Sequence, residues 1–176
     1  MVMKEGLWIL ATLLAIAAGW TDWRWRRIPN WLTVPGAILG LALNAASGWN
    51  GVRSSLLGLG LGLALLLPFV LIRSLGAGDW KLAGALGACF GPDRLLAVLF
   101  GTVLVAGVMA AVLVVWKKRV RHTLRNMGRL LAAFVTLHRP EGELSLDDPG
   151  SLKVPFGVAM AATVVLYAGG HFWGML

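Results

Sequence analysis

Long runs of apolar residues are the feature that most constrains how this chain can fold. Six such segments follow one another along the 176 residues, at 6–20, 31–46, 56–72, 80–90, 95–116 and 154–173. Hydrophobic residues make up 58% of the chain and charged residues 14%, and the mean hydropathy is +0.77. A segment in lipid must satisfy its own backbone hydrogen bonds, and about 20 helical residues cross the hydrocarbon core. The sequence therefore predicts an all-α, polytopic membrane protein with six transmembrane segments.

The first segment has a second interpretation, as a secretory signal peptide. Such a peptide begins with a positively charged region and ends at a small-residue cleavage site. Here Lys4 is offset by Glu5, so the chain lacks the net positive charge that begins such a peptide. We therefore interpret residues 6–20 as a transmembrane segment and residues 1–176 as a single membrane-embedded domain.

The basic residues predict how these segments are oriented. Of the 16 Lys and Arg residues, 13 lie in or directly beside the loops after the first, third and fifth segments: Arg24, Arg26, Arg27, Arg73, Lys81, Lys117, Lys118, Arg119, Arg121, Arg125, Arg129, Arg139 and Lys153. Lys4, Arg53 and Arg94 lie on the opposite side. Because cytoplasmic loops are enriched in Lys and Arg, we expect both termini outside and a multi-pass protein of the inner (cytoplasmic) membrane.

Two acidic residues border apolar segments on the predicted cytoplasmic side. Asp22 closes the first segment, and Asp79 follows the glycine-rich break at 76–78. The segment after Asp79 forms only about 16 Å of helix, too short for a core about 30 Å thick. A carboxylate embedded in lipid costs about 2.5 to 3.5 kcal/mol or more, so this pair is a candidate functional site. Simpler interpretations make Asp79 a helix cap, pair Asp22 with nearby arginines, and make the glycines a plain loop.

Three blocks of the sequence resemble those of the type IV prepilin peptidases, which are GxGD intramembrane aspartyl proteases. The blocks are Asp22-Trp23-Arg24-Trp25-Arg26-Arg27-Ile28-Pro29-Asn30, Gly76-Ala77-Gly78-Asp79-Trp80-Lys81-Leu82, and Val154-Pro155-Phe156-Gly157-Val158-Ala159. Only a few residues join the first two segments, which is similar to the short form in tight-adherence pilus systems and archaeal preflagellin peptidases.

The resemblance implies an aspartic endopeptidase that removes a short basic leader from prepilin-like proteins in the cytoplasm. Asp22 and Asp79 would be its catalytic carboxylates, sharing one proton because two like charges in contact cannot both ionise. The candidate substrate-binding residues are Gly76, Gly78, Lys81, Pro29 and Asn30.

The sequence also predicts a structural role for each candidate substrate-binding residue. The two glycines are expected to take dihedrals barred to other residues and to admit an extended substrate. Lys81 either tunes the acidic pair or meets substrate, or it is a plain snorkelling lysine. Pro29 suits a first helical turn, and the Asn30 side chain is expected to satisfy free backbone donors there.

The chain also departs from the larger family members. Cys89 is the only cysteine, so the paired zinc ligands of those enzymes are missing, and we expect no metal and no cofactor. No separate glycine-rich nucleotide loop is present, so the sequence gives no support for N-methylation. Trp80 replaces the usual small aliphatic residue after the motif and is expected to narrow the cleft.

The long loop at 117–153 is predicted to be a basic amphipathic helix followed by an acidic turn. Apolar residues recur at helical spacing between basic ones, which favours binding to anionic lipid of the inner leaflet. The formal net charge of +8 is also compatible with nucleic acid, but no aromatic residues alternate with the basic ones outside the apolar segments. Lipid headgroups are therefore the expected counter-charge, and the oligomeric state is left open.

Two non-proteolytic interpretations remain. Membrane carboxylates also form proton relays, as in a proton-coupled transporter. A relay needs polar steps across the membrane, whereas both acids lie on one face and the outer halves of the segments lack ionisable groups. A pilus-assembly subunit with a purely structural role would tolerate replacement of either aspartate.

Overall fold

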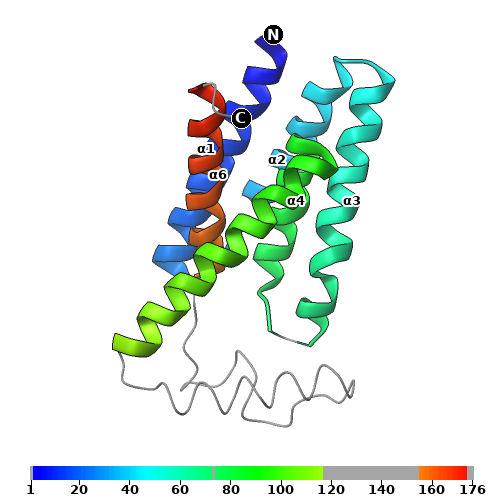
Figure 1. Ribbon diagram of the computed structural model, residues 1–176. Helices are drawn as coiled ribbons and strands as arrows, with labels where there is room; N and C mark the ends of the chain where they lie inside the picture. The colour runs from blue at the N-terminus through cyan, green and yellow to red at the C-terminus, as the bar shows by residue number, and fades with distance from the viewer. Residues whose placement is uncertain (1, 73, 117–154, 174–176) are drawn as a thin grey trace.

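The computed structural model describes residues 2–72, 74–116 and 155–173, and every regular element in these ranges is an α-helix. The helices are α1 (Val2–Trp25), α2 (Asn30–Ala45), α3 (Trp49–Leu71), α4 (Ala77–Trp116) and α6 (Phe156–Phe172). They pack side by side as a bundle (Figure 1). The all-α prediction is confirmed for the described residues. The predicted amphipathic segment at 117–153 lies outside them.

Within α4, the chain makes the break that the sequence predicted after residue 90. Gly91 has φ 74° and ψ 179°, a conformation that side-chain-bearing residues rarely adopt, and Pro92 follows it. In Figure 1 the first arm rises to this point, and the second arm descends from it and runs away from the first. Two of the predicted apolar segments thus correspond to the two arms of one broken helix.

Side chains from neighbouring helices satisfy the carbonyl groups that the break leaves free. Pro92 has no N–H to donate to the carbonyl of Ala88. Ser55 Oγ donates to that oxygen at 2.7 Å, and Asn44 Nδ2 donates to it at 2.9 Å. Asn44 Nδ2 also lies 3.2 Å from the carbonyl oxygen of Cys89. The end of the first arm is therefore capped from α2 and α3, as an interrupted helix in an apolar environment requires.

The first arm of α4 lies at the centre of the bundle, and every residue from 82 to 91 is buried. Gly58 and Gly87 allow α3 to approach this arm so closely that a Cβ on either would collide with the other's carbonyl oxygen. Small residues commonly permit such contacts between membrane helices. The short fourth segment is thus supported by its neighbours in the bundle.

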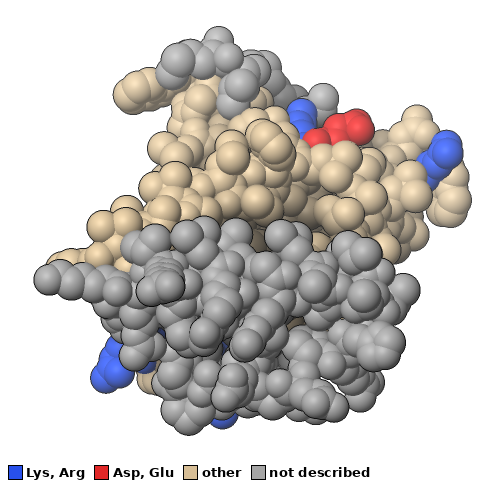
Figure 2. Space-filling model, turned by 60° about the horizontal axis from the view of Figure 1, so that its bottom comes forward, with Lys and Arg blue, Asp and Glu red and all other residues tan. Residues whose placement is uncertain are grey.

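Three of the described helices are long and apolar enough to cross a membrane: Glu5–Trp25 within α1, Trp49–Leu71 and Ala77–Trp116. The described surface in Figure 2 is mostly uncharged, and its visible charged side chains lie in a few separate places. Figure 1 places the N-terminus and the end of α6 at one end of the bundle, called here the far end. The end of α1 and the starts of α2, α4 and α6 lie at the opposite end, called here the site end.

Candidate active site

The seven candidate site residues of the sequence line one cavity of about 430 Å³ at the site end. Its wall consists of Asp22, Arg26, Arg27, Ile28, Pro29, Asn30, Gly76, Ala77, Gly78, Asp79 and Lys81. The residues come from the end of α1, the loop between α1 and α2, the start of α2, and the start of α4 with the residue before it. Folding therefore brings together two sequence blocks that are separated by α2 and α3.

Asp22 is buried in the last turn of α1, with 7% of its surface exposed. A carboxylate at this end of a helix faces the negative end of the helix dipole, which is unfavourable. The start of α6 compensates, because the backbone N–H of Gly157 donates to Asp22 Oδ2 at 3.0 Å. Asp22 is therefore a buried group, and Arg26 lies within electrostatic range of it at the same cavity.

Asp79 is the third residue of α4 and is not its cap. Its carboxylate lies near the backbone N–H groups of Gly76 and Gly157 and within electrostatic range of Asp22. Asp79 Oδ1 is buried and has no hydrogen-bond partner among the described protein groups. Burial of an unpaired carboxylate oxygen costs free energy, so this atom is suited to holding a proton or binding a reactant.

Gly157 is the site residue that the candidate set omitted. A Cβ at this position would lie 3.0 Å from both Cβ and Oδ2 of Asp22, and 2.9 Å from Cδ1 of Ile28. Only glycine lets the first turn of α6 approach the acidic pair this closely. The third sequence block contains Gly157 and could have pointed to it. Because Gly157 lies 135 residues after Asp22, the sequence did not predict that the two are in contact.

The glycines of the second block act differently from what the sequence predicted. Among the described residues, positive φ at glycine occurs only at Gly48 and Gly91, so Gly76 and Gly78 do not use barred dihedrals. A Cβ on Gly78 would lie 3.0 to 3.2 Å from Ile28, including its backbone N and O. A Cβ on Gly76 would lie 2.9 Å from Asp79 Oδ2. Both glycines therefore permit close packing around the aspartates.

The cavity rim contains a polar contact between α2 and α4. Lys81 Nζ donates to Asn30 Oδ1 at 2.9 Å. The prediction that the Asn30 side chain caps α2 is wrong, because Pro29 occupies the cap position and no side chain caps that helix end. Asn30 instead accepts a hydrogen bond from Lys81, which holds this lysine at the cavity.

Trp80 also differs from its prediction. It is absent from the cavity wall, so it does not narrow the space between the aspartates. Its indole Nε1 donates to the carbonyl oxygen of Leu63 in α3 at 2.6 Å. The ring is thus engaged with the neighbouring helix.

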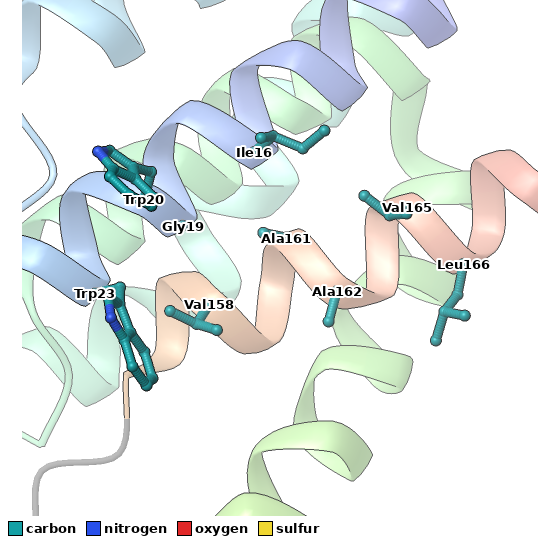
Figure 3. A pocket seen from close by; sticks show the side chains of 9 residues that line it. All are labelled: Ile16, Gly19, Trp20, Trp23, Val158, Ala161, Ala162, Val165 and Leu166. Atoms are coloured by element: carbon teal, nitrogen blue, oxygen red, sulfur yellow. The ribbon is translucent and has the colours of Figure 1, made fainter.

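A second, open cavity of about 660 Å³ lies along α1 and α6, and Figure 3 shows the side chains that line it. They are Ile16, Gly19, Trp20, Trp23, Val158, Ala161, Ala162, Val165 and Leu166. None of them carries a charge, and none belongs to the cavity that contains the aspartates. This apolar groove therefore offers no catalytic group.

The described residues hold no cluster of three or more His, Cys, Asp or Glu that could bind a metal ion. The chemistry that the described cavity offers is that of two neighbouring carboxylates, one held by a backbone N–H and the other with a free buried oxygen.

Comparison with known protein families identifies the chain. Residues 8–114 match the type IV leader peptidase family, and this stretch contains both aspartates. No significant match was found among curated proteins or among solved structures. Because the match covers more than half of its 176 residues, the chain belongs to the type IV leader peptidase family.

Proposed function

We propose that this peptidase is a membrane aspartic endopeptidase that removes the short cytoplasmic leader of type IV prepilin-like proteins. The observation that carries the proposal is the meeting of Asp22 and Asp79 in one cavity of a chain that belongs to a leader peptidase family. Two carboxylates within electrostatic range of each other and shielded from solvent favour a state in which the pair shares one proton, which supports the proposal.

In the proposed reaction, one carboxylate of the pair takes a proton from the attacking water. The other donates a proton to the carbonyl oxygen of the scissile peptide bond, and the roles exchange when the leaving amine is protonated. The Gly157 N–H holds one oxygen of Asp22, which restricts how that carboxylate can rotate. Because the pair titrates as a unit, neither aspartate is assigned as the first base.

Around the pair, we propose Gly76, Gly78, Lys81, Pro29 and Asn30 as the surface that receives the substrate. Lys81 and Asn30 form the rim, where their hydrogen bond would have to open or share its atoms with substrate. The glycines would bring substrate close to the aspartates as well as allow the packing described above. The proposed reaction requires no metal or cofactor, and N-methylation is not part of the proposal.

We also propose six membrane crossings, with both termini outside and the site end in the cytoplasm. The two arms of α4 supply two crossings, and α1, α2, α3 and α6 supply the others. Exposed tryptophans near the ends of the helices support the crossings, because tryptophan favours the lipid–water interface on both sides of the membrane. They are Trp20, Trp23 and Trp25 in the last turns of α1, Trp31 at the start of α2, Trp49 at the start of α3, Trp116 at the end of α4 and Trp173 directly after α6. The orientation rests on the distribution of Lys and Arg. The segment at 117–153 would then face anionic lipid of the inner leaflet.

The test is coexpression with candidate prepilin-like proteins from the same genome, with leader removal measured by mass spectrometry. The Asp22→Asn and Asp79→Asn variants should each lose cleavage while reaching the membrane in normal amounts, because asparagine keeps the shape but cannot cycle a proton. Asp93→Asn is the matched control, since Asp93 is exposed beside the α4 break and should be dispensable. Normal leader processing by the Asp22→Asn or the Asp79→Asn variant would refute the aspartic mechanism and favour a structural assembly role.

A further inference from the structure

Trp80 forms a bond between the start of α4 and the middle of α3. The indole N–H donates to the Leu63 carbonyl oxygen at 2.6 Å, and the ring is partly buried against the core. An indole has a single polar hydrogen, and a buried N–H without a partner is costly in apolar surroundings. The bond therefore favours one orientation of the ring against α3.

Trp80 directly follows Asp79 in the first turn of α4, so its bond to Leu63 lies next to the aspartate along the helix. Successive residues of an α-helix point about 100° apart around its axis, so turning the first arm of α4 would move Trp80 and Asp79 together. Leu63 contacts the arm a second time, because its side chain lies where a Cβ of Gly84 would be, at 2.8 Å. One residue of α3 thus engages two successive turns of the arm that carries the aspartate.

We propose that Trp80 is a positioning residue, whose bond to Leu63 sets the rotation of the first arm of α4 and thereby directs Asp79 toward Asp22. This inference rests on the proposed proteolytic function. Trp80 does not line the aspartate cavity, so it acts through the helix and does not touch the reacting atoms.

The sharpest variant replaces Trp80 with β-(3-benzothienyl)alanine, which has nearly the shape of tryptophan but has sulfur in place of the N–H. Trp80→Phe is the genetically simpler companion, and Trp49→Phe is the matched control because Trp49 is exposed at the far end. We expect kcat to fall about 10- to 100-fold in both Trp80 variants, since small misplacements of catalytic groups are that costly. KM and membrane abundance should stay unchanged, and the pH profile of kcat should shift.

A second readout does not depend on cleavage. In the Cys89→Ala background, an Asp22→Cys, Asp79→Cys double variant is treated with a short bifunctional thiol reagent, with and without Trp80→Phe. We expect efficient crosslinking when Trp80 is present and a several-fold slower reaction when it is absent. If crosslinking slows but the wild type cleaves no prepilin, the proposed function fails while the positioning role stands.

The inference is overturned if the benzothienyl variant keeps wild-type kcat and Trp80→Phe leaves crosslinking unchanged. It is also overturned if both Trp80 variants lower only the melting temperature or abundance, with normal kcat per folded molecule. That result would make Trp80 a packing residue.

Discussion

At the scale of single residues, the contact between Gly157 and Asp22 shows how a carboxylate is kept buried at an unfavourable helix end. The N–H of the second residue of α6 is free of its own helix and donates to Asp22 Oδ2. The positive end of the α6 dipole thereby lies against the negative end of the α1 dipole, with the carboxylate between them. The start of α6 thereby offsets the unfavourable interaction of Asp22 with the end of α1.

We predict that Gly157→Ala lowers the rate of leader cleavage about 10- to 100-fold. The added Cβ would lie 3.0 Å from Asp22 Oδ2 and 2.9 Å from Ile28 Cδ1, so α6 or Asp22 must move. The measurement is the initial rate of leader removal by purified enzyme in detergent or reconstituted lipid.

Gly169→Ala is the control in the same helix, since a Cβ there meets nothing within 4 Å. It should cleave normally and be equally or slightly more stable, because alanine favours helix over glycine. A Gly157→Ala enzyme as fast as the Gly169→Ala enzyme would contradict the role given to this amide.

At the scale of elements, the break in α4 makes a short arm possible at the centre of the bundle. The positive φ of Gly91 and the missing N–H of Pro92 end the arm, and Asn44 and Ser55 satisfy the carbonyls that remain. At the other end of the arm lie Asp79 and the Trp80 bond. The arm that carries one aspartate is therefore held at both of its ends by polar contacts with α2 and α3.

We predict that Asn44→Leu lowers the free energy of unfolding by about 1–3 kcal/mol, because it leaves the carbonyl of Cys89 without its side-chain donor and weakens the capping of Ala88. Ser55→Ala should cost less, since Asn44 still reaches the same Ala88 oxygen. Both effects are measured as thermal unfolding of the purified protein in detergent.

Thr12→Val provides the comparison, because the Thr12 hydroxyl donates only to the Trp8 carbonyl one turn earlier in the same helix. Removing such a bond within a regular helix should change stability little. Equal melting temperatures for Asn44→Leu and Thr12→Val would show that the α4 break does not depend on its cap.

At the scale of the whole molecule, the aspartate cavity and an aromatic cluster lie at opposite ends. In that cluster, the Trp8 ring stacks on His171, with the ring centres 4.5 Å apart. The centre of the Trp8 ring also lies 4.9 Å from that of Phe90 and 5.5 Å from that of Tyr167. The guanidinium carbon of Arg94 lies 5.5 Å from the centre of the same ring. The cluster joins α1, both arms of α4 and α6 at the far end. The contacts of Asp22 and Asp79 with Gly157 connect α1, the first arm of α4 and α6 again at the site end.

We predict that the two ends of α3 lie on opposite sides of the membrane. In a Cys89→Ala background, the Ser47→Cys variant should react with an impermeant thiol reagent in intact spheroplasts. The Ser74→Cys variant should react only in inverted vesicles. Both serines are exposed, and they flank α3 directly, so the pair is matched. The reverse pattern would place the aspartates outside and contradict cleavage of a cytoplasmic leader.

The sequence by itself determined where the described helices lie and where the fourth one breaks. Apolar runs and proline act locally, because the free energy of placing a side chain in lipid, and the loss of an N–H at Pro92, depend little on distant residues. The two acids could be identified for the same reason, since each lies beside a visible change from apolar to charged or glycine-rich sequence. Local patterns therefore made Asp22 and Asp79 candidates, and the resemblance of their sequence blocks to a peptidase family singled them out as the predicted catalytic pair.

Only the tertiary structure decided which groups surround those acids. The bond from Gly157 to Asp22 joins residues 135 positions apart, and the bond from Asn44 to Ala88 joins residues 44 apart. Such contacts depend on how each helix is rotated and how closely it packs, and local patterns do not encode either quantity. That is why the sequence predicted a cap from Asn30 and a narrowed cleft from Trp80, whereas packing turned Asn30 toward Lys81 and the Trp80 ring toward α3.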